Sequence, residues 1–330
     1  MNTKLLASTL ALFLIGGCTT VGPTRSDLVG DGKNTDNVVT YGMGYHQQRY
    51  SPLTQIKKGN VKRLAPVWTA PLDNDFGEQA QPLIYNGVVY VSNAKWTMAI
   101  DALTGKEIWR TAVDFPPETP RVVCCGVSNK GVALYNGKVF RTTLHAYVVA
   151  LDQKTGKEVW RQKAAEWKEG YSQTVAPLIA NGVLVTGISG AEFGIRGFID
   201  GWDPDTGKHL WRRHTTAGPG EKGHETWEPR EAYLHGGGST WITGSYDPEL
   251  DLMYWGTGNA GPWNPANRKG DNLYSASVLA MRPATGEIVW HYQFVPNDVY
   301  DWDSLWELIL ADLRVDGQMR KVVMQMNRNG

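Results

Sequence analysis

Three stretches of the chain carry alternating apolar and polar positions, and each is interrupted at its centre by the dipeptide Asn-Gly. They span residues 82–91, 131–140 and 177–185. Alternation with a period of two is typical of a β-strand with one buried face, and Asn-Gly is a preferred sequence for a two-residue hairpin turn. The pattern therefore predicts three antiparallel β-hairpins.

A second pattern occurs four times, over residues 99–109, 150–160, 201–211 and 280–290. Each copy contains a first strand, which ends in Asp in three copies, then a turn built on Thr-Gly, and a second strand that ends in Trp. Gly in this turn supplies the positive φ that such a hairpin needs. The Trp residues stand at positions 109, 160, 211 and 290, so their intervals are 51, 51 and 79 residues. The spacing predicts all-β units of four strands, with an insertion in the last interval.

Such a four-stranded unit cannot bury both of its faces alone. Repeated units of this kind stack around an axis as the blades of a β-propeller. We therefore expect a β-propeller of four-stranded blades, with each repeat Trp packed between neighbouring blades. Four or five units do not obviously close a ring.

The composition fits a folded globular protein and disfavours a nucleic-acid-binding one. The chain has 330 residues, 33 Lys+Arg and 33 Asp+Glu, so no excess of cationic groups is available to neutralise phosphates. It is 42% hydrophobic, and its 37 Gly and 14 Trp suit tight turns between short strands with large packing residues. Its length and apolar content are sufficient for a large core.

The N-terminus has the features of a secretory signal. A basic residue, Lys4, precedes an apolar run over residues 5–15 that is too short to span a bilayer, and two glycines precede Cys18. The Leu-Ile-Gly-Gly-Cys sequence resembles the bacterial lipobox, which implies cleavage before Cys18 and lipidation of that residue. The alternative is an ordinary signal peptide that contains a cysteine.

The lipobox implies a location in the oxidising periplasm. The signal would cover residues 1–17, and residues 18–40, rich in Gly, Thr, Asp and Asn, are expected to form a flexible tether to the membrane. No Asp follows Cys18, which by resemblance to known lipoproteins favours sorting to the outer membrane. The propeller domain would then cover residues 41–330.

The repeat, together with residues 37–53, resembles the quinoprotein dehydrogenases. These are eight-bladed propellers that use pyrroloquinoline quinone (PQQ) and include methanol and ethanol dehydrogenases. The resemblance extends from about residue 40 to residue 330 and implies that the chain covers roughly the first half of such a propeller, truncated at its C-terminus. Similar blades also occur in a non-catalytic, lipid-anchored scaffold of outer-membrane assembly, which is the alternative function.

The resemblance implies a PQQ site in which the planar quinone lies between a disulfide of the adjacent Cys124 and Cys125 and the ring of Trp241. From the residues alone, the two cysteines are also compatible with buried thiols, and Trp241 with a core aromatic residue. Lys130 matches an Arg that pairs with a PQQ carboxylate, and Lys keeps the charge without the bidentate geometry. Further cofactor contacts are implied for Thr143 (or Thr142), Ser189, Gly190, Ala191, Thr240, Arg328, and Glu78 (or Gln79 in an ungapped alignment).

Four oxygen-bearing side chains are implied as metal ligands: Glu192, Asn259, Asp301 and Asp303. Glu192 and Asn259 each follow an apolar strand, and oxygen ligands suit a hard cation such as Ca²⁺. Asp303 lies two residues after Asp301, a spacing that resembles the lanthanide-using members of the family. The metal is therefore expected to be Ca²⁺ or a lanthanide.

The implied reaction is the oxidation of a small primary alcohol to an aldehyde by hydride transfer to the quinone. Asp301 matches the general base that takes the alcohol proton, and Arg328 matches a residue that stabilises negative charge on the reduced quinone. The sequence has no Cys-x-x-Cys-His motif for c-type haem, so the electrons are expected to pass to a separate acceptor, a cytochrome c or a quinone. A nicotinamide enzyme is disfavoured, because no Gly-x-Gly-x-x-Gly motif links a strand to a helix.

Overall fold

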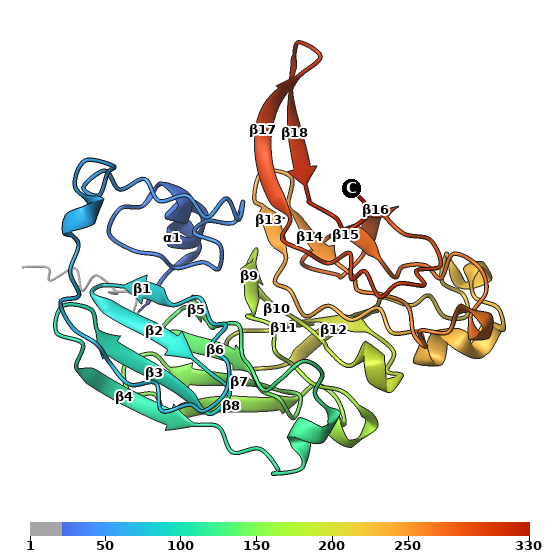
Figure 1. Cartoon of the computed structure of the whole chain (residues 1–330), viewed down its shortest axis with the longest axis horizontal. Helices are drawn as coiled ribbons and strands as arrows, with labels where there is room; N and C mark the ends of the chain where they lie inside the picture. The colour runs from blue at the N-terminus through green and yellow to red at the C-terminus, as the bar shows by residue number, and fades with distance from the viewer. Residues whose placement is uncertain (1–21) are drawn as a thin grey trace, which may run out of the picture.

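A computed structural model describes residues 22–330, which form four antiparallel sheets of four strands and one two-stranded hairpin (Figure 1). Each sheet is a meander in which consecutive strands are neighbours. The strands are β1 (Leu83–Tyr85), β2 (Val88–Ser92), β3 (Trp96–Asp101), β4 (Glu107–Ala112), β5 (Ala133–Tyr135), β6 (Lys138–Thr142), β7 (Tyr147–Asp152), β8 (Glu158–Lys163), β9 (Leu178–Ala180), β10 (Val183–Gly187), β11 (Phe198–Trp202), β12 (His209–His214), β13 (Ser245–Asp247), β14 (Leu252–Gly256), β15 (Ser277–Met281), β16 (Ile288–Gln293), β17 (Ile309–Val315) and β18 (Gln318–Met324). The prediction of four-stranded β-propeller blades is confirmed.

The predicted Asn-Gly hairpins connect the first two strands of the first three sheets. In β1–β2, Tyr85 pairs with Val88, and the turn residues Asn86 and Gly87 have φ values of 48° and 75°. Positive φ at both positions is the requirement of a type I′ turn, which Asn-Gly meets with little strain. The local sequence thus fixes the register of the first three blades at their start.

Three of the four repeat Trp residues, Trp109, Trp160 and Trp211, join neighbouring blades as predicted, whereas Trp290 is 40% exposed. The Trp109 indole donates a hydrogen bond to the carbonyl of Gln153 in the next sheet, at 3.1 Å. Its ring lies against Gly156, where an added Cβ would come within 2.5 Å of the indole. Gly156 also has a φ of 70°, so the Thr-Gly glycine serves both the turn and the close approach. The same pairing recurs in Trp68–Gly105, Trp160–Gly207 and Trp211–Gly286.

One detail of the repeat differs from the prediction, because the outer strands do not end at Trp. β4 continues past Trp109 to Ala112, and Thr111 pairs with Thr97. β8, β12 and β16 extend in the same way. Backbone hydrogen bonds to the third strand continue beyond the repeat Trp, where the sequence pattern predicts the end of the strand.

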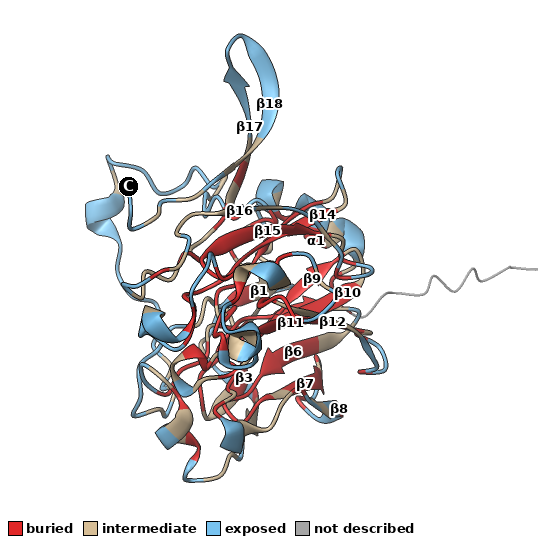
Figure 2. Cartoon of the chain, turned by 90° about the vertical axis from the view of Figure 1, so that its right-hand side faces the viewer, coloured by how far each residue is buried: buried red, intermediate tan, exposed pale blue. Residues whose placement is uncertain are grey.

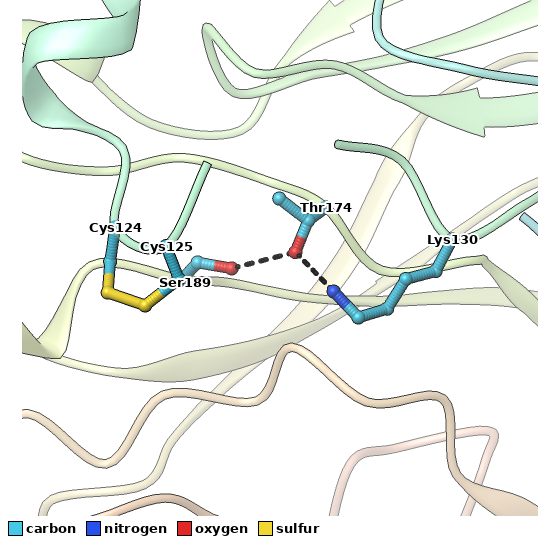
Figure 3. Close-up of a disulfide and its surroundings, with 5 residues drawn as sticks. All are labelled: Cys124, Cys125, Lys130, Thr174 and Ser189. Carbon is cyan, nitrogen blue, oxygen red and sulfur yellow. Dashed lines mark hydrogen bonds between the residues drawn. A yellow bond between two sulfur atoms is a disulfide. The ribbon is translucent and has the colours of Figure 1, made fainter. Parts of the chain in front are cut away.

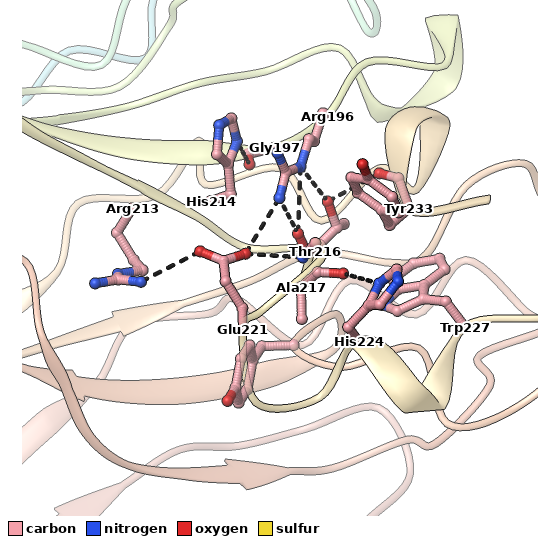
Figure 4. Close-up of polar contacts among 12 residues, drawn as sticks. Arg196, Gly197, Arg213, His214, Thr216, Ala217, Glu221, His224, Trp227 and Tyr233 are labelled. Atoms are coloured by element: carbon pink, nitrogen blue, oxygen red, sulfur yellow. Dashed lines mark hydrogen bonds and ion pairs between the residues drawn. The ribbon is translucent and has the colours of Figure 1, made fainter. Parts of the chain in front are cut away.

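The insertion expected before Trp290 is present as two long connections, over residues 215–244 and 257–276. Glu221 holds the first one, accepting hydrogen bonds from Arg196 at 3.2 Å and Arg213 at 3.4 Å (Figure 4). Arg196 also stacks on the ring of Tyr233, with its guanidinium carbon 4.7 Å from the ring centre. These partly buried contacts fold the insertion onto the third sheet.

Buried side chains are concentrated in the strands of the four sheets, whereas the β17–β18 hairpin projects from them and is largely exposed (Figure 2). The largest core cluster extends from the second sheet to the fourth and includes Phe140, Leu184 and Trp255. The cavity described below therefore rests on a continuous packed support.

The described part of the predicted tether, residues 22–40, is folded, so that expectation is wrong for these residues. Helix α1 (Arg25–Gly30) begins after Thr24, whose backbone N–H donates to Asp27, and its Leu28 belongs to the largest core cluster. Val38 pairs with Ile84 of β1. The contacts of two apolar residues, Leu28 and Val38, fold this segment although its composition is polar, and the prediction of a tether was based on that composition. The signal and Cys18 lie outside the described residues.

None of the helices in the described part of the chain is long and apolar enough to cross a bilayer.

Candidate functional site

The topology of the meanders brings the predicted site residues to one end of the sheets. In an antiparallel four-stranded meander, the connections that follow the second and fourth strands lie at the same end. Every predicted residue from Cys124 to Asp303 lies in such a connection or at its border. These predicted residues are supplied by the connections 113–132, 143–146, 188–197, 215–244, 257–276 and 294–308.

A cavity of about 170 Å³ opens among these connections. It is lined by Gln79, Val123, Cys124, Cys125, Ser128, Lys130, Ser172, Thr174, Ser189, Gly190, Glu192, Trp241 and Asp303. A larger cavity of about 380 Å³ lies elsewhere, and Lys154 is the single charged residue in its described lining. The smaller cavity is the candidate site, because charged, hydroxyl, sulfur and aromatic groups meet there.

Cys124 and Cys125 form a disulfide at the wall of the cavity (Figure 3). They follow the short helix η3 (Thr119–Val122), and Cys125 has a φ of 67°. Because the disulfide joins adjacent residues, the loop that it closes is minimal and little stabilisation is expected from it. A binding role accounts for it better than a structural one.

Lys130 is a cation without a carboxylate partner among residues 22–330. Its ammonium donates to the hydroxyl of Thr174 at 3.2 Å and lies 4.8 Å from the ring centre of Trp241. Burial lowers the pKa of Lys130 to about 8, because the charged form is poorly solvated there. The Thr174 hydroxyl in turn lies 3.4 Å from that of Ser189 (Figure 3). An anionic ligand would restore favourable electrostatics at this lysine.

Trp241 provides an aromatic surface in the same cavity. Its ring meets Trp306 edge to face, with ring centres 6.0 Å apart. The Arg328 guanidinium lies 5.3 Å from the centre of the Trp306 ring. A flat, anionic molecule matches an aromatic wall, a disulfide and an unpaired ammonium.

Three carboxylates, those of Glu192, Asp301 and Asp303, are close enough to influence one another. The pKa of Asp301 is raised, first by burial and then by Glu192 and Asp298. The pKa of Asp303 is raised to about 7, mainly by burial and by the charge of Asp301. Like charges held together in a partly buried place favour either protonation or a bound cation.

The site fits a hard metal ion. Asn259 Oδ1 and Asp301 Oδ1 are buried and accept no hydrogen bond within the described residues, so both oxygens are available as ligands. Within residues 22–330, no three His, Cys, Asp or Glu side chains converge closely enough to form a preformed metal site. The proposed ligand set therefore includes the amide oxygen of Asn259 beside the carboxylates. Ca²⁺ and similar ions prefer sites that have only oxygen donors.

Gly258 allows the segment carrying Asp303 to approach the end of β14. A Cβ at Gly258 would lie 2.5 Å from a carboxylate oxygen of Asp303 and 3.0 Å from the Ser239 hydroxyl. The backbone N–H of Asn259 donates to the same Asp303 oxygen at 3.3 Å. A larger residue at position 258 would separate Asp303 from Asn259.

Arg328, predicted to contact the quinone, lies beside Asp301. One of its guanidinium nitrogens donates to the carbonyl of Asp301 at 3.2 Å. Its charge opposes the rise in the pKa values of Asp301 and Asp303. Gly190 lines the cavity, and Ala191 is buried in the short helix η5 (Ala191–Phe193) that carries Glu192.

Five predicted cofactor contacts are not among the lining residues: Glu78, Thr143, Ala191, Thr240 and Arg328. Thr143 is buried and its hydroxyl accepts the N–H of Tyr147, so it stabilises its own turn. The Thr240 hydroxyl donates to the carbonyl of Phe198 and accepts the N–H of Ile188, which occupies it within the fold. Glu78 accepts hydrogen bonds from Asn74 and Asn93, whereas its neighbour Gln79 lines the cavity. The ungapped alternative, Gln79, is the one that the geometry favours.

Sequence reasoning missed three hydroxyl residues of the lining, Ser128, Ser172 and Thr174. Ser172 is fully buried and its hydroxyl has no partner within the described residues. Its backbone pairs with Ser189 in both directions, at 3.1 and 2.8 Å. The position of Ser172 and Thr174 in the connection after a fourth strand is the signal that would have pointed to them.

Comparison with known proteins gives a consistent result. The family model of the glucose/ethanol/alcohol dehydrogenase β-propeller domain (PQQ) matches residues 39–330. The quinohemoprotein alcohol dehydrogenase ADH IIB of Pseudomonas putida is 44% identical over 307 residues, which cover 88% of this chain and 44% of that protein. The quinoprotein alcohol dehydrogenase PedH of Pseudomonas putida is 41% identical over 340 residues, which cover 97% of this chain and 57% of that protein.

A solved structure of a europium-containing methanol dehydrogenase superposes with a TM-score of 0.88 at 35% identity, covering 93% of this chain and 57% of that chain. The chain therefore spans about half the length of the relatives that it matches.

Proposed function

The chain belongs to the PQQ-dependent alcohol dehydrogenase β-propeller family, and from this premise we propose that it forms the cofactor- and metal-binding part of an alcohol-oxidising enzyme. The relatives are named as dehydrogenases, so a non-catalytic scaffold is not favoured. The proposed substrate is a small primary alcohol.

The observation that carries the proposal is the convergence of a disulfide, an unpaired ammonium and an acidic group in one cavity. PQQ is a planar tricarboxylate. Its ring system would lie between the Cys124–Cys125 disulfide and Trp241, and Lys130 would pair with one of its carboxylates. Thr174, Ser189 and Ser172 offer hydroxyl donors on the same wall.

Glu192, Asn259, Asp301 and Asp303 would hold the metal ion. A cation there would offset the repulsion among the three carboxylates and keep Asp301 ionised at neutral pH. Asp303 adds one more anionic ligand to the set, which favours a trivalent lanthanide over Ca²⁺.

PQQ, when bound, supplies an electrophilic quinone that accepts a hydride. The Asp301 carboxylate would take the proton of the alcohol oxygen while the alcohol carbon gives up a hydride to the quinone, and this two-electron oxidation would yield an aldehyde. Arg328, beside Asp301, would stabilise negative charge as it develops. The two electrons would then leave to a cytochrome c or a quinone.

We further propose a periplasmic location with a lipid anchor at Cys18, on the strength of the lipobox-like sequence. Mass spectrometry of the mature N-terminus after expression in a Gram-negative host would show a diacylated cysteine. A mature chain that retains residues 1–17, or starts at another position, would contradict this part.

The direct test of the function uses the chain reconstituted with PQQ and either Ca²⁺ or La³⁺. We expect PQQ absorbance to remain after desalting and dye-linked oxidation of short primary alcohols to depend on one of the ions. Loss of all PQQ absorbance on desalting with both ions would overturn the proposal.

A further inference from the structure

The segment that carries Asp301 and Asp303 is not held by a β-ladder. Residues 294–308 connect β16 to β17 without forming a strand (Figure 1). Asn297, Asp301 and Asp303 all have φ values in the left-handed region, at 48°, 58° and 46°. Asn and Asp adopt such values more readily than other non-glycine residues, and the values show that the backbone turns here instead of running as an extended strand. Other groups must therefore fix this segment.

The Asp298 carboxylate fixes the backbone on both sides of Asp301. Asp298 is 1% exposed, and its two oxygens accept the N–H of Tyr300 at 2.8 Å and the N–H of Trp302 at 2.9 Å. These peptides flank Asp301 directly. A shift of Asp298 would therefore turn the Asp301 side chain.

Asp298 is tied in turn to the connection 257–276 by the fully buried Arg268. The Arg268 guanidinium donates to the carbonyl of Asp298, to the carbonyl of Pro262 at 2.7 Å and to the side-chain oxygen of Asn272 at 2.9 Å. Asn297 closes the network, donating to the same Asn272 oxygen at 3.1 Å. The connection that Arg268 joins to Asp298 is also the one that carries Asn259.

Arg268 does not act on Asp301 through its charge. The cation that opposes the raised pKa of Asp301 is Arg328, whereas the charge of Arg268 is felt by Asp298. Its four hydrogen bonds, to Asp298, Pro262, Asn272 and Trp263, instead set the distance between two backbone segments. A planar guanidinium can do this and an ammonium cannot, because the donors must be held in a fixed geometry.

We propose that Arg268 and Asp298 form a buried clamp that positions the catalytic base and the metal ligands of the proposed site by locking the connection of Asp301 and Asp303 onto that of Asn259. Arg268 is a positioning residue, since it acts through Asp298. The consequence of the clamp for catalysis rests on the proposed function. The positioning of the two connections, in contrast, is a property of the metal-free chain.

The test compares Arg268→Gln and Arg268→Lys with the parent and with Arg141→Gln, a matched control. Arg141 is also almost fully buried and also donates to backbone carbonyls, but it lies in the second sheet and contacts none of the residues of the clamp. The first measurement is amide hydrogen exchange of residues 297–305 in the metal-free chain. We expect both Arg268 variants to lose at least about tenfold protection at Tyr300 and Trp302, and Arg141→Gln to retain it.

The second measurement is Eu³⁺ affinity, with the luminescence lifetime in H₂O and D₂O reporting the number of bound waters. We expect the Arg268 variants to bind Eu³⁺ about 10- to 100-fold more weakly, the usual effect of losing an outer-shell partner of a metal ligand, and with more bound water. Unchanged protection at residues 297–305, or equal loss in Arg141→Gln, would overturn the clamp. Failure of the parent chain to bind Eu³⁺ would instead count against the proposed metal site and leave the exchange result to decide the clamp.

Asp298→Asn provides the same test if the Arg268 variants do not fold. It keeps the size of the side chain but replaces one of the two accepting oxygens by a donor. Protection at Trp302 or Tyr300 should fall by about tenfold, and protection equal to that of the parent would overturn the proposal.

Discussion

At the scale of single residues, Asp301 is the side chain on which the proposed chemistry depends most directly. Its buried Oδ1 accepts no hydrogen bond within residues 22–330, so this oxygen can receive a proton or bind a metal. Asp301→Asn should leave PQQ retention within about twofold and lower the dye-linked rate by about 10²- to 10⁴-fold, because the amide cannot take the alcohol proton. The exposed Asp316→Asn is the matched control, and unchanged turnover in Asp301→Asn would exclude Asp301 as the base.

Asp303 should determine which metal supports activity. Asp303→Ala removes one anionic ligand, which a trivalent ion needs more than a divalent one. We expect the La³⁺-dependent rate to fall at least about tenfold more than the Ca²⁺-dependent rate, measured with the same alcohol. An equal loss with both ions would remove the argument for a lanthanide.

Lys130 should make PQQ binding depend on pH. Burial lowers the pKa of Lys130 to about 8, and the protonated form is the one that attracts a carboxylate. PQQ affinity should therefore be constant below about pH 8 and fall by up to about tenfold per pH unit above it. Fluorescence titration between about pH 7 and pH 9.5 measures this, with Lys130→Arg as the control that stays charged. Parallel curves for the two proteins would contradict the assignment.

The residues of the site could be predicted from the sequence where a motif carries them, and not where only the fold does. Cys124, Cys125, Trp241 and Asp303 line the cavity as expected. Thr143 does not line the cavity, and its hydroxyl oxygen accepts the backbone N–H of Tyr147 in a tight turn. Thr174 was missed because its closeness to Lys130 comes from a contact between residues 44 positions apart.

At the scale of elements, the indole–glycine pairing should contribute a large share of the stability between blades. Trp160 is 9% exposed and donates to Pro204, whereas Trp290 is 40% exposed and donates no hydrogen bond within residues 22–330. Trp160→Ala should lower the free energy of unfolding by about 3–5 kcal/mol, and Trp290→Ala by less than about 1 kcal/mol. Urea denaturation compares the two, and equal losses would show that the pairing is not the cause.

The elements themselves follow the sequence closely because their turns are local. Asn-Gly and Thr-Gly impose positive φ values within two residues, and the strands on either side then pair without long-range information. Residues 22–40 were misjudged for the opposite reason. Leu28 and Val39 are buried by the β-sheets, and no local sequence pattern predicts that contact.

At the scale of the whole molecule, the cavity draws residues from connections that belong to all four sheets. A ligand bound there should therefore stabilise the sheets together. PQQ with metal at about 100 times its dissociation constant should raise the free energy of unfolding by about 2.7 kcal/mol, in a single shifted thermal transition. Trp241→Ala, which lacks the aromatic wall, should show a smaller shift. A transition that splits into a shifted and an unshifted part would contradict this picture.

The two ends of the sheets carry different kinds of sequence. The Asn-Gly and Thr-Gly turns, and the glycines that receive the indoles, lie in the connections after the first and third strands, whereas the cavity is built by those after the second and fourth. Assembly and chemistry are thus encoded by separate sets of positions along the same repeat. A protein built in this way can exchange its connections at one end, and with them its choice of alcohol or metal, while the other end continues to specify how the blades join.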